Sequence, residues 1–168
     1  MKYHELETDR LKLRMWRESD LDDYAAICAD PIVMRYLGGQ VFTRDEAWRS
    51  MAFFIGHWQL RGYGHWAVEE KATGRMIGRI GFLNPEGWPG FEIGWTLARH
   101  AWGKGYATEG ARLALQYAFK DLDQPHVISL IHPDNTPSMK VAERLGEKRE
   151  GVARIFERDV LVYGVNRP

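Results

Sequence analysis

Residues 91–109 read F-E-I-G-W-T-L-A-R-H-A-W-G-K-G-Y-A-T-E. The apolar segment 91–97 predicts a β-strand, and the alanine-rich segment 105–120 predicts a helix. The turn between them contains Gly103 and Gly105. Glycine lets the backbone approach a ligand closely, and the unpaired N–H groups at the start of a helix, together with the helix dipole, bind phosphate oxygens. This stretch therefore predicts an anion-binding turn between a strand and a helix.

Two other phosphate-binding motifs do not fit the same residues. A Walker A loop would require glycine at Ala98 and serine or threonine at Gly105. A dinucleotide-binding fingerprint would require glycine or alanine at Thr108, and it would require a βαβ unit, whereas the strands before the turn are predicted to be antiparallel. The two glycines by themselves are equally compatible with a turn that only connects a strand to a helix.

The remaining sequence predicts one α/β domain over residues 1–168. Period-two alternation and turn residues predict strands at 11–15, 64–70, 76–83 and 126–132 and around Val152 and Leu161. Capping residues and helical spacing predict helices at 19–29, 43–62 and 137–145, the first of them closed by Asp30-Pro31. Hairpins require antiparallel neighbours, while strand-helix-strand connections favour parallel ones. We therefore expect a mixed, mostly antiparallel sheet of about seven strands, flanked by about four helices, with a cleft where strands part.

Composition excludes several classes of function. Lys and Arg together number 23, as do Asp and Glu, so the chain has no net charge that would attract nucleic acid or an anionic membrane. The first ten residues lack the apolar core of a signal peptide, and no apolar run approaches the roughly 18 residues of a membrane span, so a cytoplasmic protein is expected. The only cysteine, Cys28, is expected to be a small buried residue. The six histidines lack the spacing of a zinc site, so no metal is expected.

With its flanking segments included, the chain resembles the ribosomal-protein N-acetyltransferases (the RimJ/RimL-like group) of the GNAT superfamily. The resemblance spans nearly the whole chain. It is carried by L-E-T-D-R-L-K-L-R at 6–14, D-P-I-V-M-R-Y-L at 30–37, F-E-I-G-W-T-L at 91–97, W-G-K-G-Y-A-T-E at 102–109 and H-P-D-N-T-P-S-M-K-V-A-E-R-L-G at 132–146. It implies a GNAT fold, with splayed strands forming the cofactor cleft, and an acetyl-CoA-dependent N-acetyltransferase that transfers the acetyl group directly to a primary amine in a ternary complex.

The resemblance also implies how acetyl-CoA would be bound. Superfamily members bind the coenzyme A pyrophosphate with the motif Gln/Arg-x-x-Gly-x-Gly/Ala, whose first position is His100 here. The residues expected at the pyrophosphate are Gly103, Lys104, Gly105, Tyr106, Ala107 and Thr108. The residues whose backbone is expected to pair with the pantetheine arm are Thr96, Leu97 and Ala98. Asn135 and Ser138 match an Asn-x-x-Ser pattern that borders the pantetheine and the thioester.

Transfer to an amine requires a base, because at pH 7 only about one lysine side chain in 2,500 is neutral, against roughly one α-amine in ten. Glu92 is the candidate base, since it is the one acid in the apolar strand before the turn and matches the strand-borne glutamate of the family. It would act directly or through a water molecule. The alternative is a surface carboxylate paired with Arg79 or Arg99.

Many superfamily members place a tyrosine acid seven residues after the motif asparagine, where this chain has Ala142. Ser138 or a bound water is therefore the candidate proton donor, and the alternative for Ser138 is a helix cap. The missing tyrosine, together with His100, leaves open a second function, a module that senses acyl-CoA without turnover. The acceptor is expected to be a protein N-terminus or a small-molecule amine, and the protein a monomer or a homodimer. Five aromatic residues could line the acceptor pocket or belong to the core: Trp58, Tyr63, Trp66, Trp88 and Trp95.

Overall fold

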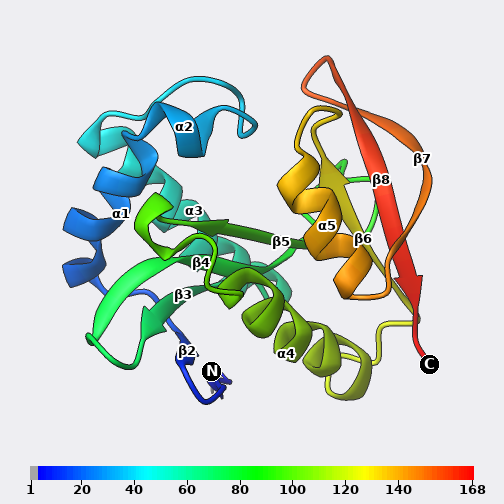
Figure 1. The fold of residues 1–168 in the computed structure, drawn as a ribbon, viewed down its shortest axis with the longest axis horizontal. Coiled ribbons are helices and arrows are strands. Elements are labelled where there is room, and N and C mark those ends of the chain that lie inside the picture. The colour runs from blue at the N-terminus through cyan, green and yellow to red at the C-terminus, as the bar shows by residue number, and fades with distance from the viewer. Residues whose placement is uncertain (1–3) are drawn as a thin grey trace.

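The structure, a computed structural model that describes residues 4–168, is built on one sheet (Figure 1). Its strands are β1 (Leu6–Glu7), β2 (Leu11–Arg14), β3 (His65–Glu70), β4 (Arg75–Leu83), β5 (Glu92–Leu97), β6 (His126–Ile131), β7 (Lys148–Ile155) and β8 (Arg158–Asn166). They lie in the order β1-β2-β3-β4-β5-β6-β8-β7. All neighbouring strands are antiparallel except β5 and β6, which are parallel. The predicted mixed, mostly antiparallel α/β fold is confirmed.

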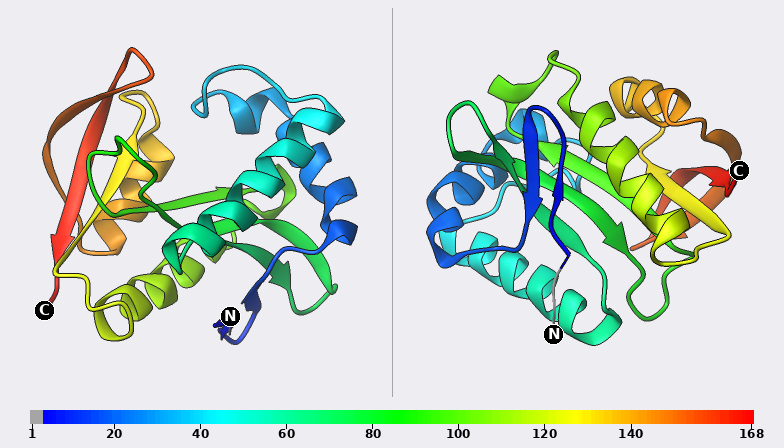
Figure 2. Two further views of the ribbon diagram at one scale, coloured as in Figure 1. Left: turned by 180° about the vertical axis from the view of Figure 1, so that it is seen from behind. Right: turned by 90° about the horizontal axis from the view of Figure 1, so that it is seen from below.

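Helices cover both faces of this sheet (Figure 2). They are α1 (Leu21–Cys28), α2 (Pro31–Met34), α3 (Arg44–Arg61), α4 (Tyr106–Lys120) and α5 (Thr136–Arg144), with 3₁₀ turns η1 (Glu18–Asp20) and η2 (Arg99–Ala101). Helices α1 and α3 pack on one face, and α4 and α5 lie on the other. None of the helices between residues 4 and 168 is both long and apolar enough to cross a membrane.

The structure has one strand and one helix more than the sequence predicts. Strand β1 is only two residues long, which is too short for an alternating pattern to be recognised. Helix α2 was missed because Asp30-Pro31 was expected only to close α1. Instead, Asp30 Oδ1 accepts a hydrogen bond from the Ile32 backbone N–H at 2.9 Å, and Pro31 occupies the first turn, so the same two residues begin a new helix.

The predicted capping residues of α3 are found at both of its ends, whereas at α1 the Asp20 side chain makes no capping bond and the C-cap of α5 is Leu145. Thr43 and Glu46 form the expected capping box at the start of α3, and Gly62, with φ of 77°, ends that helix in the left-handed conformation. At α5 the cap is Asn135, whose Oδ1 accepts from the Ser138 backbone N–H at 3.3 Å. Ser138 is therefore not the cap of this helix, and its hydroxyl is available for another role.

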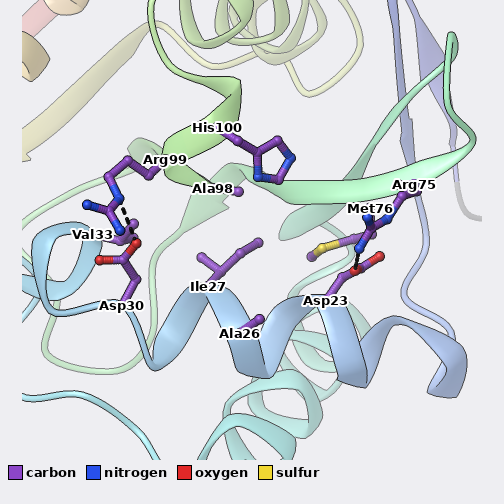
Figure 3. A pocket seen from close by; sticks show the side chains of 10 residues that line it. All are labelled: Asp23, Ala26, Ile27, Asp30, Val33, Arg75, Met76, Ala98, Arg99 and His100. Carbon is purple, nitrogen blue, oxygen red and sulfur yellow. Dashed lines mark hydrogen bonds and ion pairs between the residues drawn. The ribbon is translucent and has the colours of Figure 1, made fainter.

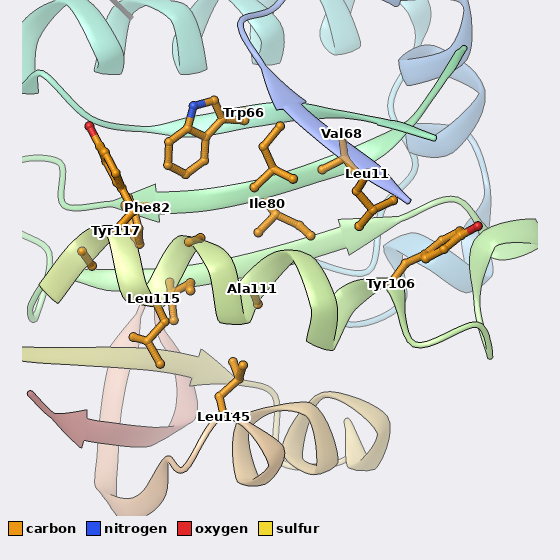
Figure 4. Packing of buried hydrophobic residues seen from close by; sticks show 14 of the residues in the cluster. Leu11, Trp66, Val68, Ile80, Phe82, Tyr106, Ala111, Leu115, Tyr117 and Leu145 are labelled. Carbon is orange, nitrogen blue, oxygen red and sulfur yellow. The ribbon is translucent and has the colours of Figure 1, made fainter. Parts of the chain in front are cut away.

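The core lies between the sheet and its two helical layers. On the α4 side, apolar residues of β2, β3 and β4 pack against that helix (Figure 4). Helix α4 approaches the sheet closely at Gly110, where an added β-carbon would lie 2.5 Å from Ile80 Cδ1. On the other face a second cluster includes Cys28, which is buried as predicted, and burial raises the pKa of its thiol. The α4 side of the core thus fixes the start of α4 relative to the strands.

Strands β5 and β6 separate soon after they meet. Their only paired position is Glu92 with Ile128, and the Ile128 N–H donates to the Phe91 carbonyl at 2.9 Å. Beyond this point β5 continues beside β4 while β6 continues beside β8. The splay expected between two strands is confirmed at this place, and we refer to the point where β5 and β6 separate as the splay point.

Candidate active site

The glycine turn leads directly into α4 and leaves the first amides of that helix unused by the helix. Gly103 and Gly105 have φ of 74° and 80°, in the left-handed region that favours glycine, and Gly105 is the N-cap of α4. The first helical bond of the turn runs from the Glu109 N–H to the Gly105 carbonyl at 3.0 Å. The amides of residues 106–108 therefore have no acceptor within the helix. A β-carbon on Gly103 would meet no atom within 4 Å, so this glycine borders open space.

Side chains in and beside the turn form hydrogen bonds and ion pairs with Glu70 of β3 and with residues 8–10, between β1 and β2. The Tyr106 hydroxyl donates to Glu70 at 2.8 Å, and Lys104 Nζ lies 3.6 Å from the same carboxylate. These contacts lower the pKa of Glu70, and the Tyr106 hydrogen bond has the largest effect. Glu109 accepts from Arg10 Nε at 2.7 Å and from the Thr8 hydroxyl at 2.6 Å. The start of α4 is thus bonded to residues 8–10 and to Glu70 of β3, and the turn's lysine is directed toward a protein carboxylate.

A cleft of about 1220 Å³ runs from this turn to the first turn of α5. Of the residues predicted to bind the cofactor, the cleft is lined by Thr96, Leu97, Gly103, Gly105, Tyr106, Ala107, Thr108, Asn135 and Ser138. Residues distant in sequence are therefore brought together as expected. Two other predicted residues do not line it, because Lys104 is paired with Glu70 and Ala98 borders a separate cavity.

The cleft also contains residues that the sequence did not single out. The cations Arg112, Lys140 and Arg144 line it from α4 and α5. Lys140 and Arg144 are four residues apart, so they lie on the same face of α5. This spacing could have been recognised in the sequence as a pair of neighbouring cations. At the other end, α2 and the segment after it contribute the apolar or aromatic side chains of Ile32, Val33, Tyr36 and Leu37 and the cation Arg35.

The two edges of β5 have different hydrogen-bonding roles. The Ala98 N–H donates to the Ile77 carbonyl at 2.8 Å, so even-numbered residues of β5 direct their backbone groups toward β4. Odd-numbered residues face the opposite side, which beyond the splay point is the cleft. The Leu97 carbonyl accepts from the Trp102 indole at 2.9 Å. The backbone N–H groups presented to the cleft are accordingly those of Trp95 and Leu97.

Ser138 lies at the N-terminal end of α5, opposite β5. Trp95 Nε1 donates a hydrogen bond to Ser138 Oγ at 3.3 Å, which orients the hydroxyl across the cleft. Ala142 is fully buried one helical turn later, within the cluster that covers β6 and β8. The first turn of α5 therefore places the Ser138 hydroxyl next to the Trp95 side chain of β5.

Glu92 is partly buried at the splay point, and its hydrogen-bond partner is Trp88. The Trp88 indole donates to Glu92 Oε2 at 2.7 Å. Arg99 instead pairs with Asp30 at 2.9 Å, and an Arg79 guanidinium nitrogen lies 3.1 Å from His65 Nδ1, so the alternative of a surface ion pair is wrong. Burial raises the pKa of Glu92 to about 7, against the Trp88 hydrogen bond, the Arg79 charge and the Leu130 backbone N–H, which favour the ionised form.

Of the five aromatic residues considered for an acceptor pocket, only Trp95 lines the cleft. Trp58 and Trp66 are buried in the core, and Tyr63 packs against it. Trp88 is instead bound to Glu92. For Trp58, Tyr63 and Trp66, the alternative that these aromatic residues belong to the core is therefore confirmed.

A second cavity of about 510 Å³ lies between α1 and the start of the η2 turn (Figure 3). His100 borders this cavity and not the cleft, so the side chain at the first motif position is directed elsewhere. Four charged side chains that line this cavity form ion pairs with one another: Asp23 with Arg75 at 2.5 Å, and Asp30 with Arg99 at 2.9 Å. Among residues 4–168, no group of three or more His, Cys, Asp or Glu side chains is arranged to bind a metal ion.

A splayed sheet, a helix start with unused amides and a cleft bordered by β5, α4 and α5 are the features of the acyl-CoA-dependent transferases. Residues 10–148 match the acetyltransferase (GNAT) domain, and the chain is 33% identical over 155 residues to the uncharacterized N-acetyltransferase p20 of Bacillus licheniformis, covering 91% of this chain and 87% of that protein. The chain belongs to the GNAT family and is an acetyl-CoA-dependent acetyltransferase.

Solved structures agree with this assignment. The acetyltransferase from Agrobacterium tumefaciens str. C58 is similar with a TM-score of 0.89 and 30% identity, covering 99% of this chain and 96% of that one. A RimL ribosomal L7/L12 α-N-protein acetyltransferase, solved in complex with coenzyme A, has a TM-score of 0.81 at 20% identity, covering 97% of this chain and 98% of that one. The expected likeness to ribosomal-protein acetyltransferases is thus confirmed for the fold.

Proposed function

We propose that this protein transfers the acetyl group of acetyl-CoA to a primary amine by direct attack in a ternary complex. The observation that carries the proposal is the arrangement of three features, two of which line one cleft. These are the unused amides at the start of α4, the outward-facing amides of β5, and Glu92 at the splay point. The third, Glu92, does not line the cleft but lies three residues before Trp95 on the same strand. Together they offer an anion site, an extended strand edge and a base, which are the groups that acetyl transfer from a coenzyme A thioester requires.

The cleft fits coenzyme A chemically. The backbone amides of residues 106–108, with the open space at Gly103, would bind the pyrophosphate. The N–H groups of Trp95 and Leu97 would pair with the amide-bearing pantetheine arm, and Thr96 and Asn135 would border it. The N–H of Ala98 would not pair with the pantetheine arm, because it already donates to the Ile77 carbonyl. Lys104 would act through its charge near the turn, and Arg112, Lys140 and Arg144 would bind the remaining phosphate charge.

Glu92 is proposed as the base, directly or through a water molecule. With a pKa of about 7, its carboxylate is half ionised near neutral pH and binds a proton more readily than an ordinary glutamate. When the thioester carbonyl rather than a pantetheine amide lies beside Trp95, the Trp95 N–H would polarise that carbonyl, and the Leu97 N–H would remain paired with the pantetheine arm. Ser138, oriented by Trp95, or a bound water would protonate the leaving thiolate. Acetyl-CoA supplies the activated acetyl group.

The acceptor is proposed to be a protein N-terminal α-amine or a small-molecule amine. The far end of the cleft is bordered by Ile32, Tyr36 and Leu37 and by the cation Arg35. The Tyr36 ring lies 5.0 Å from the His132 ring, so the segment after α2 contacts the loop before α5. The name of the RimL neighbour describes a protein N-terminus as acceptor of that enzyme. An end of the cleft that combines apolar side chains with one arginine is compatible with a peptide backbone carrying small side chains.

We further propose that residues 1–168 act as one cytoplasmic domain, without a nucleic acid or membrane partner, as a monomer or a homodimer. The continuous sheet and the equal numbers of acidic and basic residues support this setting. Residues 1–3 lie outside the described part of the chain.

The alternative is a module that binds acyl-CoA without turnover, motivated by Ala142 at the usual tyrosine position. The two functions are separated by incubating the protein with acetyl-CoA and a panel of amines, including α-amines of short peptides, lysine side chains and polyamines, while free thiol is measured. Thiol release that depends on one amine class supports acetyl transfer. Tight binding of coenzyme A with no amine-dependent thiol release would favour the sensor.

A further inference from the structure

Ser129 of β6 lies at the splay point, next to the residue that pairs with Glu92. Its side chain is buried, and its Oγ lies 3.0 Å from the backbone carbonyl of Ile93 in β5. The same Oγ lies 3.0 Å from Oε1 of Glu147, the residue before β7. A parallel ladder would continue with the Leu130 N–H donating to Ile93, because the preceding bond joins Ile128 to Phe91. The Ser129 hydroxyl therefore binds a carbonyl that the splay would otherwise leave unpaired.

The two contacts of Ser129 determine the protonation of Glu147. A serine hydroxyl carries a single proton, and a backbone carbonyl can only accept. If Glu147 were ionised, its carboxylate and the Ile93 carbonyl would both need the single proton of Ser129. One of the two oxygens would then face Ser129 Oγ at 3.0 Å with no proton between them. If Glu147 is protonated, it donates to Ser129, and Ser129 donates to Ile93. Only the neutral acid satisfies both contacts.

The surroundings of Glu147 point the same way. The residue is 3% exposed, and its Oε2 has no hydrogen-bond partner in the described structure. An unpartnered buried oxygen costs less on a neutral acid than on a carboxylate. Burial raises the pKa of Glu147 to about 8, opposed by the Ser129 hydrogen bond and reinforced by the negative charges of Glu150 and Glu92.

No nearby cation offsets these effects among the groups that act on Glu147 in residues 4–168. Glu150 of β7 is paired with His126 at 3.0 Å. From β8, Tyr163 pairs in register with Ser129 and offers a buried phenol. The residues that follow Glu147, Lys148 and Arg149, are exposed.

We propose that Glu147 is a positioning residue of the cofactor cleft. As a neutral acid it keeps the Ser129 hydroxyl on the Ile93 carbonyl, and this chain fixes β5 where it separates from β6. The next backbone groups on the same edge of β5 are the N–H groups of Trp95 and Leu97. The proposal rests on the proposed function only where it assigns these amides to acetyl-CoA.

Ionisation of Glu147 disrupts the chain, because the Ser129 proton is then drawn to the carboxylate and the Ile93 carbonyl loses its donor. The unfolded glutamate ionises near 4.5, while the folded one keeps its proton up to about 8. Between these values the folded state binds more protons, so stability falls as pH rises through this window. One pH unit above the folded pKa, about nine in ten Glu147 side chains are ionised, and we expect a loss of coenzyme A affinity there.

The direct measurement is a pH titration of the wild-type Glu147 side-chain carboxyl by ¹³C NMR, with sequence-specific assignment. It needs no variant and no activity. We expect a midpoint near 8. A midpoint near the ordinary value of 4.5 would overturn the proposal, because Glu147 would then be ionised at neutral pH.

The variant Glu147→Gln supplies the second measurement, since its amide donates to Ser129 at every pH. Unfolding and coenzyme A binding are measured at pH 6, 7 and 9, with Glu150→Gln as a control that removes a neighbouring surface charge. We expect E147Q to match the wild type in coenzyme A affinity at pH 6 and 7, to exceed it at pH 9, and to lose this advantage when combined with S129A. In stability E147Q should exceed the wild type at pH 6 and by a larger margin at pH 7 and 9, because only the wild type loses stability between about 4.5 and about 8. Equal pH dependence in E147Q and the wild type would contradict the proposed role.

These results are independent of acetyl transfer. A protein that releases no thiol with any amine, but whose Glu147 titrates near 8 and whose E147Q variant loses the pH dependence of stability, would overturn the proposed function alone. An active enzyme with an ionised Glu147 at pH 7 would overturn this inference alone.

Discussion

His65 and Glu92 flank the space above Gly94, where a β-carbon would lie 3.5 Å from His65 Nε2 and 3.9 Å from Glu92 Oε1. Arg79 can only donate, so its contact at 3.1 Å makes His65 Nδ1 the acceptor and leaves the ring proton on Nε2. Burial and the Arg79 charge lower the pKa of His65 well below its usual value, so the ring is neutral. A neutral N–H donor and the proposed base thus face one small space that only glycine leaves open.

Replacing Gly94 with alanine tests whether this space holds the acceptor amine or a water. The added methyl would make ordinary van der Waals contacts, the nearest at 3.4 Å from His65 Cε1, so the fold should tolerate it. We expect turnover to fall by about tenfold or more, equivalent to about 1.4 kcal/mol in the barrier, with coenzyme A affinity retained. Steady-state kinetics and calorimetric binding provide the comparison. Wild-type turnover in G94A would place the reaction elsewhere.

Glu92→Gln removes the proposed base while keeping the side-chain shape. Wild-type kcat/KM is expected to rise with pH through about 7, as Glu92 ionises, and E92Q should lack this rise. General-base catalysis typically contributes about 10² to 10⁴-fold, so the difference between the two proteins should be largest above pH 7. A pH profile unchanged in both shape and height would remove Glu92 from the mechanism.

Trp88→Phe should shift the same profile without abolishing it. The Trp88 indole stabilises ionised Glu92 through a 2.7 Å hydrogen bond, so its loss should raise the pKa of Glu92 above about 7. The ascending limb of the pH–rate profile should then move to higher pH, while the rate at high pH changes less. The matched control is Trp48→Phe, an exposed tryptophan of α3, which should leave the profile in place.

The cations on α5 should contribute to cofactor affinity through charge. Replacing Lys140 and Arg144 together with alanine removes two positive charges from the cleft wall. We expect coenzyme A affinity to fall roughly fivefold to tenfold, or about 1 to 1.4 kcal/mol, and to depend less on salt. The control Arg49→Ala removes an exposed charge on α3, paired with Asp45, and should not change affinity. Equal salt dependence in the double variant and the wild type would argue against phosphate contacts there.

A stability prediction concerns the buried pair of Arg14 and Asp20. Both side chains are 3% exposed, and the guanidinium contacts the carboxylate at 2.8 and 2.9 Å, while the Arg17 backbone N–H donates to the same group. Asp20→Ala leaves Arg14 buried with only Glu69 opposite it. We expect up to about 3 kcal/mol of lost unfolding free energy, because the buried guanidinium loses one of its two carboxylate partners while Glu69 remains. Chemical denaturation measures this, and a loss below about 1 kcal/mol would show that the site rehydrates.

Local patterns predicted much of this protein. The capping box at Thr43, the terminating Gly62 and the strand-turn-helix around Gly103 act over a few neighbouring residues, so their residue types are sufficient to recognise them. The same holds for the residues of the glycine turn, most of which line the cleft as expected. Asp30-Pro31 shows the limit of such patterns, because an Asp-Pro pair both ends one helix and begins another.

Pairwise geometry between distant segments decided the rest. That Glu92 is bound by Trp88 and not by an arginine depends on how the loop before β5 folds back. That Ser138 is oriented by Trp95, and that His100 faces a second cavity, depends on packing between β5, α5 and α1. Glu147 had no recognisable pattern in sequence, because its proton is retained only when Ile93, Ser129 and two other acids are brought around it. Short-range preferences are properties of the chain, whereas burial and proton affinity depend on neighbours that only the assembled sheet supplies.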